Sequence, residues 1–473
     1  MSSISSALSS LLSGSSSSSV DLSSILEAAF GASSPGLDVT AAVNSAVTAA
    51  QAPEQAWYSQ ESLIQNQISA LKQIQTYTTN LDNDIQSLNS IVGPLSARTV
   101  SSSNSNVVTA SAASGSTMGN HVVVVNNLAT TASWTSGIFA SSTTALPAGS
   151  FTITAGSGAT ATITTDGSQT LSDVANQING DNLGLTASVI TDASGSRLAI
   201  VANTSGSGAN FTVDDSASPS FGFTQAVTGT NAALTVDGIS ISSASNTVTG
   251  AVPGLTLNLL SADPGVQVSL GVSQDVSQAT TAINQFVGDY NTAISALNSQ
   301  FTYVAGSGEG VLSTDSSIRN LQSALLSAIN YTYTPSSGTT TMPNLSSLGI
   351  SMQNDGTLSV DSSALQSALQ NNFSDVQSFF QGASFNGFSN SLDQQLNSFL
   401  SPGNGAFTVD LQSLNSEYGD LQTEISNFET NYIQPLRTQL QNEYSKAEIL
   451  LQQLPMEMQQ INTELGQNSS SNH

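Results

Sequence analysis

The segment from Leu411 to Leu465 carries large apolar residues at alternating steps of three and four, the spacing of one face of a long helix. Most of its other residues are polar, so the apolar face must pack against another helix. The steps become four, four and four between Tyr432 and Tyr444. Because a proline inside a helix costs about 3 kcal/mol, we expect a kink or short break at Pro435, with Pro455 as a second candidate. The apolar positions are Leu411, Leu414, Tyr418, Leu421, Ile425, Phe428, Tyr432, Leu436, Leu440, Tyr444, Ala447, Leu451, Leu454, Met458, Ile461 and Leu465.

A second apolar face of nearly the same spacing runs from Ile64 to Val92, and Gly93 and Pro94 end it. Burial of each large side chain stabilises a fold by about 1.5 to 3 kcal/mol, so the two segments can hold the chain ends together. The alternative is that each segment dimerises separately as an independent coiled coil. The face consists of Ile64, Ile68, Leu71, Ile74, Thr78, Leu81, Ile85, Leu88 and Val92.

The composition excludes several classes of partner and site. Charged residues make up only 8% of the chain, and the formal net charge is −26, which disfavours nucleic acid and anionic membrane surfaces. The absence of Cys excludes disulfides and thiolate catalysis. No apolar run reaches the length of a membrane span. The serine-rich start lacks the basic and apolar regions of a Sec signal, so we expect any export to use another route.

Helical periodicity at both ends of the chain and short β-branched runs in its middle predict an α+β multidomain protein. We expect both chain ends to form a discontinuous helical coiled-coil leg, and β-rich head domains to be inserted between them. The serine-rich tail is interpreted either as a segment that becomes helical against a partner or as a flexible leader. The expected parts are a tail at 1–36, a helical leg at 37–100 and 273–435, a β head domain at 101–145 and 231–272, an inserted β-rich head domain at 146–230, and a C-terminal coiled-coil tail at 436–473.

Short β-branched runs between residues 100 and 270 predict strands, and one helical face lies at Leu171–Ile178 with Thr170 or Ser172 as its cap. Asp166-Gly167 and Asp237-Gly238 are interpreted as hairpin turns, because glycine supplies the positive φ such turns require. The predicted strands are His121–Val125, Phe151–Thr154, Ala161–Thr165, Leu185–Ile190, Arg197–Ala202, Leu234–Val236, Gly254–Leu259 and Val266–Leu270.

Helical periodicity returns at Asp275. Asn354-Asp355-Gly356 predicts a hairpin turn, Asp361 or Ser362 a helix cap, and Asp38 or Thr40 another. The expected helical faces are Ile283, Phe286, Tyr290, Ile294, Leu297 and Phe301, and then Ile318, Leu321, Leu325 and Ile329.

Motifs for catalysis, nucleotide binding and zinc binding are absent from the sequence. The histidines are His121, interpreted as a strand residue, and His473. Asp82 with Asp84, and Asp214 with Asp215, lack the spacing of a calcium site, and we interpret the first pair as a solvated helix face. We therefore expect no enzyme, cofactor or metal. The candidate residues for helix packing and assembly are Leu71, Leu81, Ile85, Leu88, Phe286, Tyr290, Leu421, Ile425, Phe428, Tyr432, Leu440 and Leu451.

Four stretches resemble the flagellar filament cap family, also called hook-associated protein 2 or FliD. They are HVVVVNNLATTAS (121–133), LTVDGISISSASNTVTGAVPGLTLNLLSADPG (234–265), DVSQATTAINQFVGDYNTAI (275–294) and LGISMQNDGTLSVDSSALQSAL (348–369). With the helical flanks, the resemblance covers about 37–465. The segment 151–213 resembles, more loosely, a small β-rich insert of flagellins and hook-associated proteins.

The resemblance implies a secreted structural protein at the distal tip of the bacterial flagellum. Several copies, most often five, form a ring that guides secreted flagellin into the filament and prevents its loss. Hook-filament junction proteins and an export chaperone are the other implied partners, and export runs through the flagellar type III apparatus. Two rival functions remain: a surface adhesin that binds host or matrix glycans, and a filament or junction subunit. Adhesion and capping can also coexist.

Overall fold

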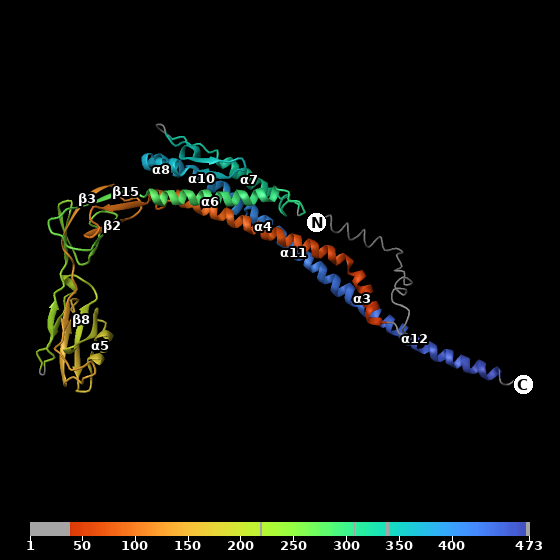
Figure 1. Cartoon of the computed structure of the whole chain (residues 1–473), viewed down its shortest axis with the longest axis horizontal. Helices are drawn as coiled ribbons and strands as arrows, with labels where there is room; N and C mark the ends of the chain where they lie inside the picture. The colour runs from red at the N-terminus through yellow and green to blue at the C-terminus, as the bar shows by residue number, and fades with distance from the viewer. Residues whose placement is uncertain (1–37, 218–219, 307, 336–339, 470–473) are drawn as a thin grey trace. The chain divides into compact units, whose positions relative to one another are not determined.

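The computed structural model describes residues 38–217, 220–306, 308–335 and 340–469 (Figure 1). The chain forms two compact units. Of the described residues, those in 38–79, 293–323 and 396–469 form the terminal unit, and those in 80–292 and 324–395 form the central unit. The serine-rich tail of the sequence analysis lies outside the described residues. In the described ranges, no helix is long and apolar enough to cross a membrane.

The first helices of the terminal unit begin at residues that the sequence marks as helix starts. Helix α3 (Val39–Ala50) is capped by Asp38, whose Oδ1 accepts a hydrogen bond from the Ala41 amide at 2.9 Å. Helix α4 (Ala52–Asn89) follows at once and continues into the central unit. It ends before the short 3₁₀ helix η1 (Pro94–Ser96), so Val92, expected on the apolar face, lies beyond the helix and is exposed.

The C-terminal helices continue through the position where we expected a break. Helix α11 (Ala406–Phe428) passes into a π-helical turn, η4 (Glu429–Ile433), and then into α12 (Gln434–Ser469). Proline has no N–H to bond the carbonyl four residues earlier, and a wider turn relieves the resulting strain. In place of the kink or break predicted at Pro435, the structure has a π-helical turn that ends two residues before the proline, and α12 continues through Pro455.

Helices α6 (Val276–Phe301) and α7 (Ser316–Ala328) begin in one unit and end in the other. Within the terminal unit, Gln322 Nε2 donates to Asn298 Oδ1 at 2.7 Å, and the Arg319 guanidinium lies over the Phe301 ring, 6.0 Å from its centroid. These contacts join the end of α6 to the start of α7.

Five of the described strands form an antiparallel sheet in the order β1-β15-β3-β11-β12, and three more form a second sheet, β13-β14-β2. Alternating Val and Leu side chains from both sheets share one core, which includes Val123, Leu257 and Leu270. The strands are β1 (Arg98–Ser102), β2 (Val108–Ala112), β3 (Gly119–Asn127), β11 (Ala232–Val236), β12 (Ile239–Ser243), β13 (Thr247–Thr249), β14 (Leu255–Leu259) and β15 (Val268–Gln274).

A second β core lies between β3 and β11 in the sequence. Its sheets have the orders β10-β4-β8-β7 and β6-β5-β9, and helix α5 (Leu171–Gly180) packs against β7 and β8 (Figure 1). The core takes in β4, which precedes residue 146. A short 3₁₀ helix, η2 (Ser207–Ala209), precedes β9. The strands are β4 (Ser133–Thr135), β5 (Gly149–Thr154), β6 (Thr160–Thr165), β7 (Leu185–Asp192), β8 (Gly195–Ala202), β9 (Thr212–Asp214) and β10 (Thr224–Val227).

The two Asp-Gly turns have different outcomes. Asp237-Gly238 joins β11 to β12 as a hairpin, with positive φ at both residues. Asp166-Gly167 does not make a hairpin, because β6 leads into α5. The Asp166 carboxylate accepts from Ser168, and the Gln169 side chain accepts from the Asp166 amide, so the turn is closed by side chains before Thr170 caps the helix.

The helical part of the central unit closes around a cluster of aromatic rings. Phe286 of α6 meets Phe380 and Phe388 edge-on, with centroids 6.5 and 5.6 Å apart. The hairpin of β16 (Ile350–Met352) and β17 (Leu358–Val360) is tied to α6 by Asn291, whose side chain accepts from the Leu358 amide at 2.6 Å and donates to its carbonyl at 2.8 Å. The other elements are η3 (Leu345–Leu348), α8 (Ser362–Asn371), α9 (Phe373–Gln381) and α10 (Phe388–Leu400).

Candidate assembly site

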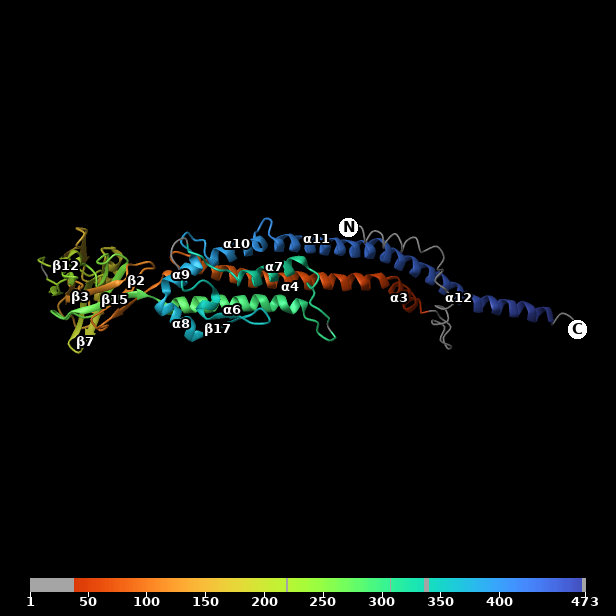
Figure 2. The ribbon, with the colours of Figure 1, turned by 90° about the horizontal axis from the view of Figure 1, so that it is seen from above.

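Helices α4 and α11 of the terminal unit pack along their apolar faces, and both views show them side by side (Figures 1 and 2). Ile64 of α4 is buried against Leu421 and Ile425 of α11. Trp57, Ile68, Leu414 and Tyr418 pack around these three and are partly buried. The expected pairing of the two helical flanks is confirmed.

Uncharged amides line the edges of this packed pair. Each donates to a carboxylate or a hydroxyl on the opposite helix, so these cross-helix bonds need no oppositely charged partners and depend less on salt than ion pairs do. Those bonds are Gln60 Nε2 to Glu417 Oε1 (3.3 Å), Gln65 Nε2 to Tyr418 Oη (2.7 Å) and Gln422 Nε2 to Glu61 Oε1 (3.1 Å). A fourth bond, Gln51 Nε2 to Glu429 Oε1 (2.7 Å), joins the α3–α4 junction to the π-helical turn.

A second apolar contact joins α3 to the region of the π-helical turn. Val43 and Val47 of α3 are buried against Ile433, and Leu440 and Tyr444 pack against them from α12. The π-helical turn shifts the apolar face by one residue, because it holds an extra residue in the turn. Ile433 is therefore 1% exposed, whereas Tyr432, which the spacing assigns to the face, is 52% exposed.

Three aromatic rings mark the junction between these two contacts. Trp57 meets Phe428 edge-on, with centroids 5.2 Å apart, and Phe428 stacks on Tyr432 at 5.1 Å. Both arrangements are favourable for aromatic pairs. The rings lie where α11 passes into the π-helical turn.

The candidates from the sequence fall into three groups. Leu71, Leu81, Ile85, Leu88, Phe286 and Tyr290 have no exposed surface. Leu421 and Ile425 are buried in the contact with α4. Phe428 and Leu440 are half-buried in the contact of α3 with Ile433. Tyr432 and Leu451 are exposed.

Helix α12 exposes a series of large apolar side chains after Tyr444. Ile449, Leu450 and Met456 are 55%, 62% and 65% exposed. Ile461 is also exposed. Exposed apolar side chains that gather in patches are typical of association surfaces.

Asp82 on α4 is buried and Asp84 is half-buried, contrary to the solvated face predicted for the pair. Asp82 is 7% exposed, and burial, followed by the charge of Asp393, raises its pKa to about 6. Burial and then the Asp289 carboxyl raise the pKa of Asp84 to about 7. The prediction was wrong because the partners come from α6 and α10, far away in the sequence. A local signal existed: Asp82 follows Thr78 by four residues and adjoins Leu81, on the packed face.

The terminal unit holds related groups. Glu54 is 3% exposed, and burial and the charge of Glu429 raise its pKa. Burial also raises the pKa of Asp410, next to Asp315. Carboxyls that are buried or half-buried and face another carboxyl thus recur along the described helices.

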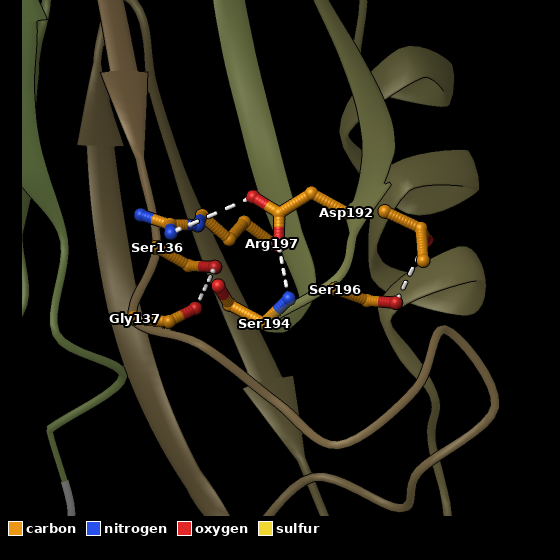
Figure 3. A network of polar contacts seen from close by, with 7 residues as sticks. Ser136, Gly137, Asp192, Ser194, Ser196 and Arg197 are labelled. Atoms are coloured by element: carbon orange, nitrogen blue, oxygen red, sulfur yellow. Dashed lines mark hydrogen bonds and ion pairs between the residues drawn. The ribbon is translucent and has the colours of Figure 1, made fainter.

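The ion pairs of the described residues lie on the β cores. His121 lies in β3, as predicted, and its Nδ1 is 2.7 Å from Asp237 Oδ2. At the tip of the β7–β8 hairpin, Arg197 is 3.8 Å from Asp192, whose other oxygen accepts from the Ser194 amide at 2.7 Å (Figure 3). Asp214 and Asp215 bond to Ser216 and to Ser220, Phe221 and Phe223. Among the described residues, no group of acidic or histidine side chains suits a metal ion.

Family models match most of the chain. The N-terminal and C-terminal models of flagellar hook-associated protein 2 match residues 35–132 and 229–456, and the flagellin hook IN motif matches residues 150–204. The chain is 30% identical over 355 residues to the B-type flagellar hook-associated protein 2 of Pseudomonas aeruginosa, covering 68% of this chain and 74% of that protein. The chain belongs to the flagellar hook-associated protein 2 family.

Other members of this family extend the match. Flagellar hook-associated protein 2 of Aeromonas caviae is 28% identical, covering 83% of this chain and 90% of that protein. The crystal structure of the flagellar cap protein FliD from Escherichia coli, domains D1-D2-D3, superposes with a TM-score of 0.57 at 26% identity. The superposition covers 73% of this chain and 99% of the Escherichia coli chain. The α+β architecture of helical ends around a β-rich middle is thus that of hook-associated protein 2.

Proposed function

We propose that this protein caps the distal tip of the bacterial flagellar filament, where it guides the insertion of secreted flagellin and prevents its loss. The observation that carries the proposal is the packing of α4 on α11, in which Gln60 bonds to Glu417 across 357 residues. The two chain ends form one helical support, with the β cores inserted between them in the sequence. Such a protein acts through binding and folding energy, and no catalytic residue is needed.

In this proposal several copies form a ring, and five is the expected number. The exposed apolar side chains of α12 supply part of the contact between copies or with the N-terminal segment. We propose that the chain beyond Tyr444 pairs with the N-terminal segment only in the assembled state. Amide hydrogen exchange along α12 is then slower in capped filaments than in free monomer, and equal protection in the two samples contradicts the pairing.

The polar faces of the terminal unit are proposed as the surface that contacts flagellin. Their side chains are largely uncharged amides, as the bonds across α4 and α11 illustrate. Contacts of this kind act at short range and are little affected by ionic screening. Binding of the cap to filament tips should therefore persist from low to moderate salt, and a collapse over that range contradicts this role.

The remaining partners follow from the family. We propose export in an unfolded state through the flagellar type III apparatus without a Sec signal, assisted by a chaperone, and placement next to hook-filament junction proteins. The lack of Cys is compatible with such a passage. We also propose the leg and head division of the sequence analysis, with the inserted domain beginning before β4, because β4 pairs with β8.

Immunogold labelling of intact cells tests the proposed location directly. An antibody against residues 101–272 should label the distal tips of filaments, a few copies at each. Cells lacking the protein provide the control for specificity. Label along the filament, at its base or over the cell body contradicts the cap and favours a subunit, a junction protein or an adhesin.

A further inference from the structure

Two pairs of carboxyl groups connect α4 to its neighbours in the helical part of the central unit. The members of each pair come from different helices: Asp82 faces Asp393 of α10, and Asp84 faces Asp289 of α6. Neither pair is used in the proposed capping function or in the proposed contacts with flagellin.

The first pair is held by one amide group. Gln86 Nε2 donates to Asp82 Oδ2 at 2.7 Å and to Asp393 Oδ1 at 3.2 Å, so both carboxyls lie against the same nitrogen. The other Asp82 oxygen, Oδ1, is buried and has no hydrogen-bond partner. An ionised carboxyl pair offers only acceptors, so this oxygen gains a partner only when a proton enters the pair.

The second pair has the same chemistry on another side of α4. Asp84 Oδ2 is buried without a hydrogen-bond partner, and the carboxyl that faces it is that of Asp289. Gln285 Nε2 donates to Asp289 Oδ2 at 2.9 Å. Two residues along a helix correspond to a rotation of about 200°, so Asp82 and Asp84 face different neighbouring helices.

Basic side chains are few in the sequence, and the ion pairs of the described residues are His121–Asp237 and Arg197–Asp192, so none involves these carboxyls. The groups that act on Asp82 are Asp393 and Gln86, and the group that acts on Asp84 is Asp289. The central unit contains Arg98, which donates to the carbonyls of residues 96, 97 and 116, and Arg197, which pairs with Asp192. The other basic residues, Lys72, Arg319, Arg437 and Lys446, belong to the terminal unit.

We propose that the two carboxyl pairs form a proton-dependent latch, in which a proton held within each pair fastens α4 to α10 and α6 in acidic medium, and loss of that proton in neutral to alkaline medium loosens these helices. The shared proton converts two facing acceptors into a donor and an acceptor. Without it, two like charges remain at a packed interface with no cation to compensate them.

The direction of the pH effect follows from the chemistry of the pairs. Burial and a facing carboxyl raise the pKa of Asp82 to about 6 and that of Asp84 to about 7. An ordinary aspartate in the unfolded chain has a pKa of about 4. Between about pH 4 and about pH 6 to 7, the folded state therefore binds more protons than the unfolded chain. The latch stabilises the fold most below about pH 4, and its contribution decreases as the pH rises through about 6 to 7.

Hydrogen exchange of the full-length protein tests the latch. Protection factors, corrected for intrinsic exchange, are compared at about pH 5 and about pH 8 for the amides of residues 80–89. A pKa shift of one unit changes the opening equilibrium, and with it the protection factor, by about tenfold. We expect protection at the lower pH to exceed that at the higher pH by at least about tenfold. Equal protection at both values overturns the proposal.

The double variant Asp82→Asn, Asp84→Asn removes the titration and keeps a donor facing each partner. We expect it to show at about pH 8 the protection that the wild type shows at about pH 5, with its pH dependence lost. Asp420→Asn, the same change at an exposed position of α11, should leave the wild-type dependence intact. A double variant that retains the wild-type pH ratio contradicts the latch.

Infrared absorption of the wild type provides a readout of protonation itself, separate from stability. At about pH 5.5, above the range in which ordinary aspartates are protonated, the wild type should retain the absorption of protonated carboxyl groups. The partner variants Asp393→Asn and Asp289→Asn should each reduce it. A wild-type spectrum without protonated carboxyls at this pH excludes the shared protons and overturns the proposal.

Discussion

Trp57 of α4 packs edge-on against Phe428 of α11, with ring centroids 5.2 Å apart and an interplanar angle of 89°. The contact joins the two chain ends at the point where α11 passes into the π-helical turn. We expect Trp57→Ala to destabilise the terminal unit by about 2 kcal/mol, less than for a fully buried tryptophan because Trp57 is half-buried. Urea unfolding followed by helical circular dichroism measures the loss.

The chain offers an internal reference for this experiment. Its only other tryptophan, Trp134, lies in the second β core, where its Nε1 donates to the Phe211 carbonyl at 3.0 Å. The fluorescence transition of Trp134 should stay unchanged in Trp57→Ala, and Tyr58→Ala, at an exposed neighbour, should have little effect. A double-mutant cycle with Phe428→Ala should give a coupling of about 0.5 to 1.5 kcal/mol, and no coupling contradicts the ring contact.

Tyr290 is completely buried in α6, and its hydroxyl has no hydrogen-bond partner. Burial also raises the pKa of this hydroxyl, as expected for a group removed from water. We expect Tyr290→Phe to stabilise the fold by about 1 kcal/mol, because it removes an unsatisfied polar group and keeps the ring. Tyr290→Ala should cost about 4 kcal/mol through the cavity it leaves. Chemical denaturation followed by circular dichroism measures both, and clear destabilisation by Tyr290→Phe would reveal a missing partner.

Gly349 and Gly238 have nearly the same backbone conformation, with φ of 82° and 81°. A Cβ at Gly349 would lie 2.7 Å from Ala364 Cβ, whereas a Cβ at Gly238 would meet nothing within 4 Å. We therefore expect Gly238→Ala to cost about 1 kcal/mol from backbone strain alone, and Gly349→Ala at least about 2 kcal/mol. Equal losses for the two variants in urea unfolding contradict the steric account.

Local patterns were sufficient to predict much of the fold. Asp38, Thr170 and Asp361 cap helices through bonds to amides only a few residues away, so the sequence contains all of each cap. The same holds for the Asp237-Gly238 hairpin. Asp166-Gly167 was wrongly predicted, because the dipeptide alone does not reveal whether a strand or the cap of α5 follows.

Long-range contacts explain the main failures. Asp82 and Asp84 carry no local sign of their partners, since Gln86 reaches Asp393 across 307 residues. Ile433, and not Tyr432, is buried against α3 from the other end of the chain, so the one-residue shift could not be derived from the spacing of α11 and α12 alone. The apolar faces themselves were predictable, because their period is a property of one helix.

The His121–Asp237 pair makes the β11–β12 turn sensitive to pH. The hydrogen bond from His121, followed by the bond from the Val122 amide, lowers the pKa of Asp237. A carboxyl whose pKa is lower in the folded state than in the unfolded chain stabilises the fold at pH values above its unfolded pKa. This contribution is lost as the pH falls through the folded-state pKa. Because the Asp237 side chain is 46% exposed, we expect Asp237→Asn to cost less than about 1 kcal/mol at neutral pH and nearly nothing near pH 3.

Asp237→Ala provides the stronger companion change. Asp237 has a φ of 50°, which alanine tolerates poorly, and alanine also loses the acceptor for the Val122 amide at 2.8 Å. We expect it to cost about 1 kcal/mol more than Asp237→Asn, and that excess should persist at low pH because backbone strain does not titrate. Hydrogen exchange of the amides of residues 236–239 measures both variants. If the Asn variant lost as much protection near pH 3 as at neutral pH, the turn would depend on amide geometry, and the charge on Asp237 would have no part in its stability.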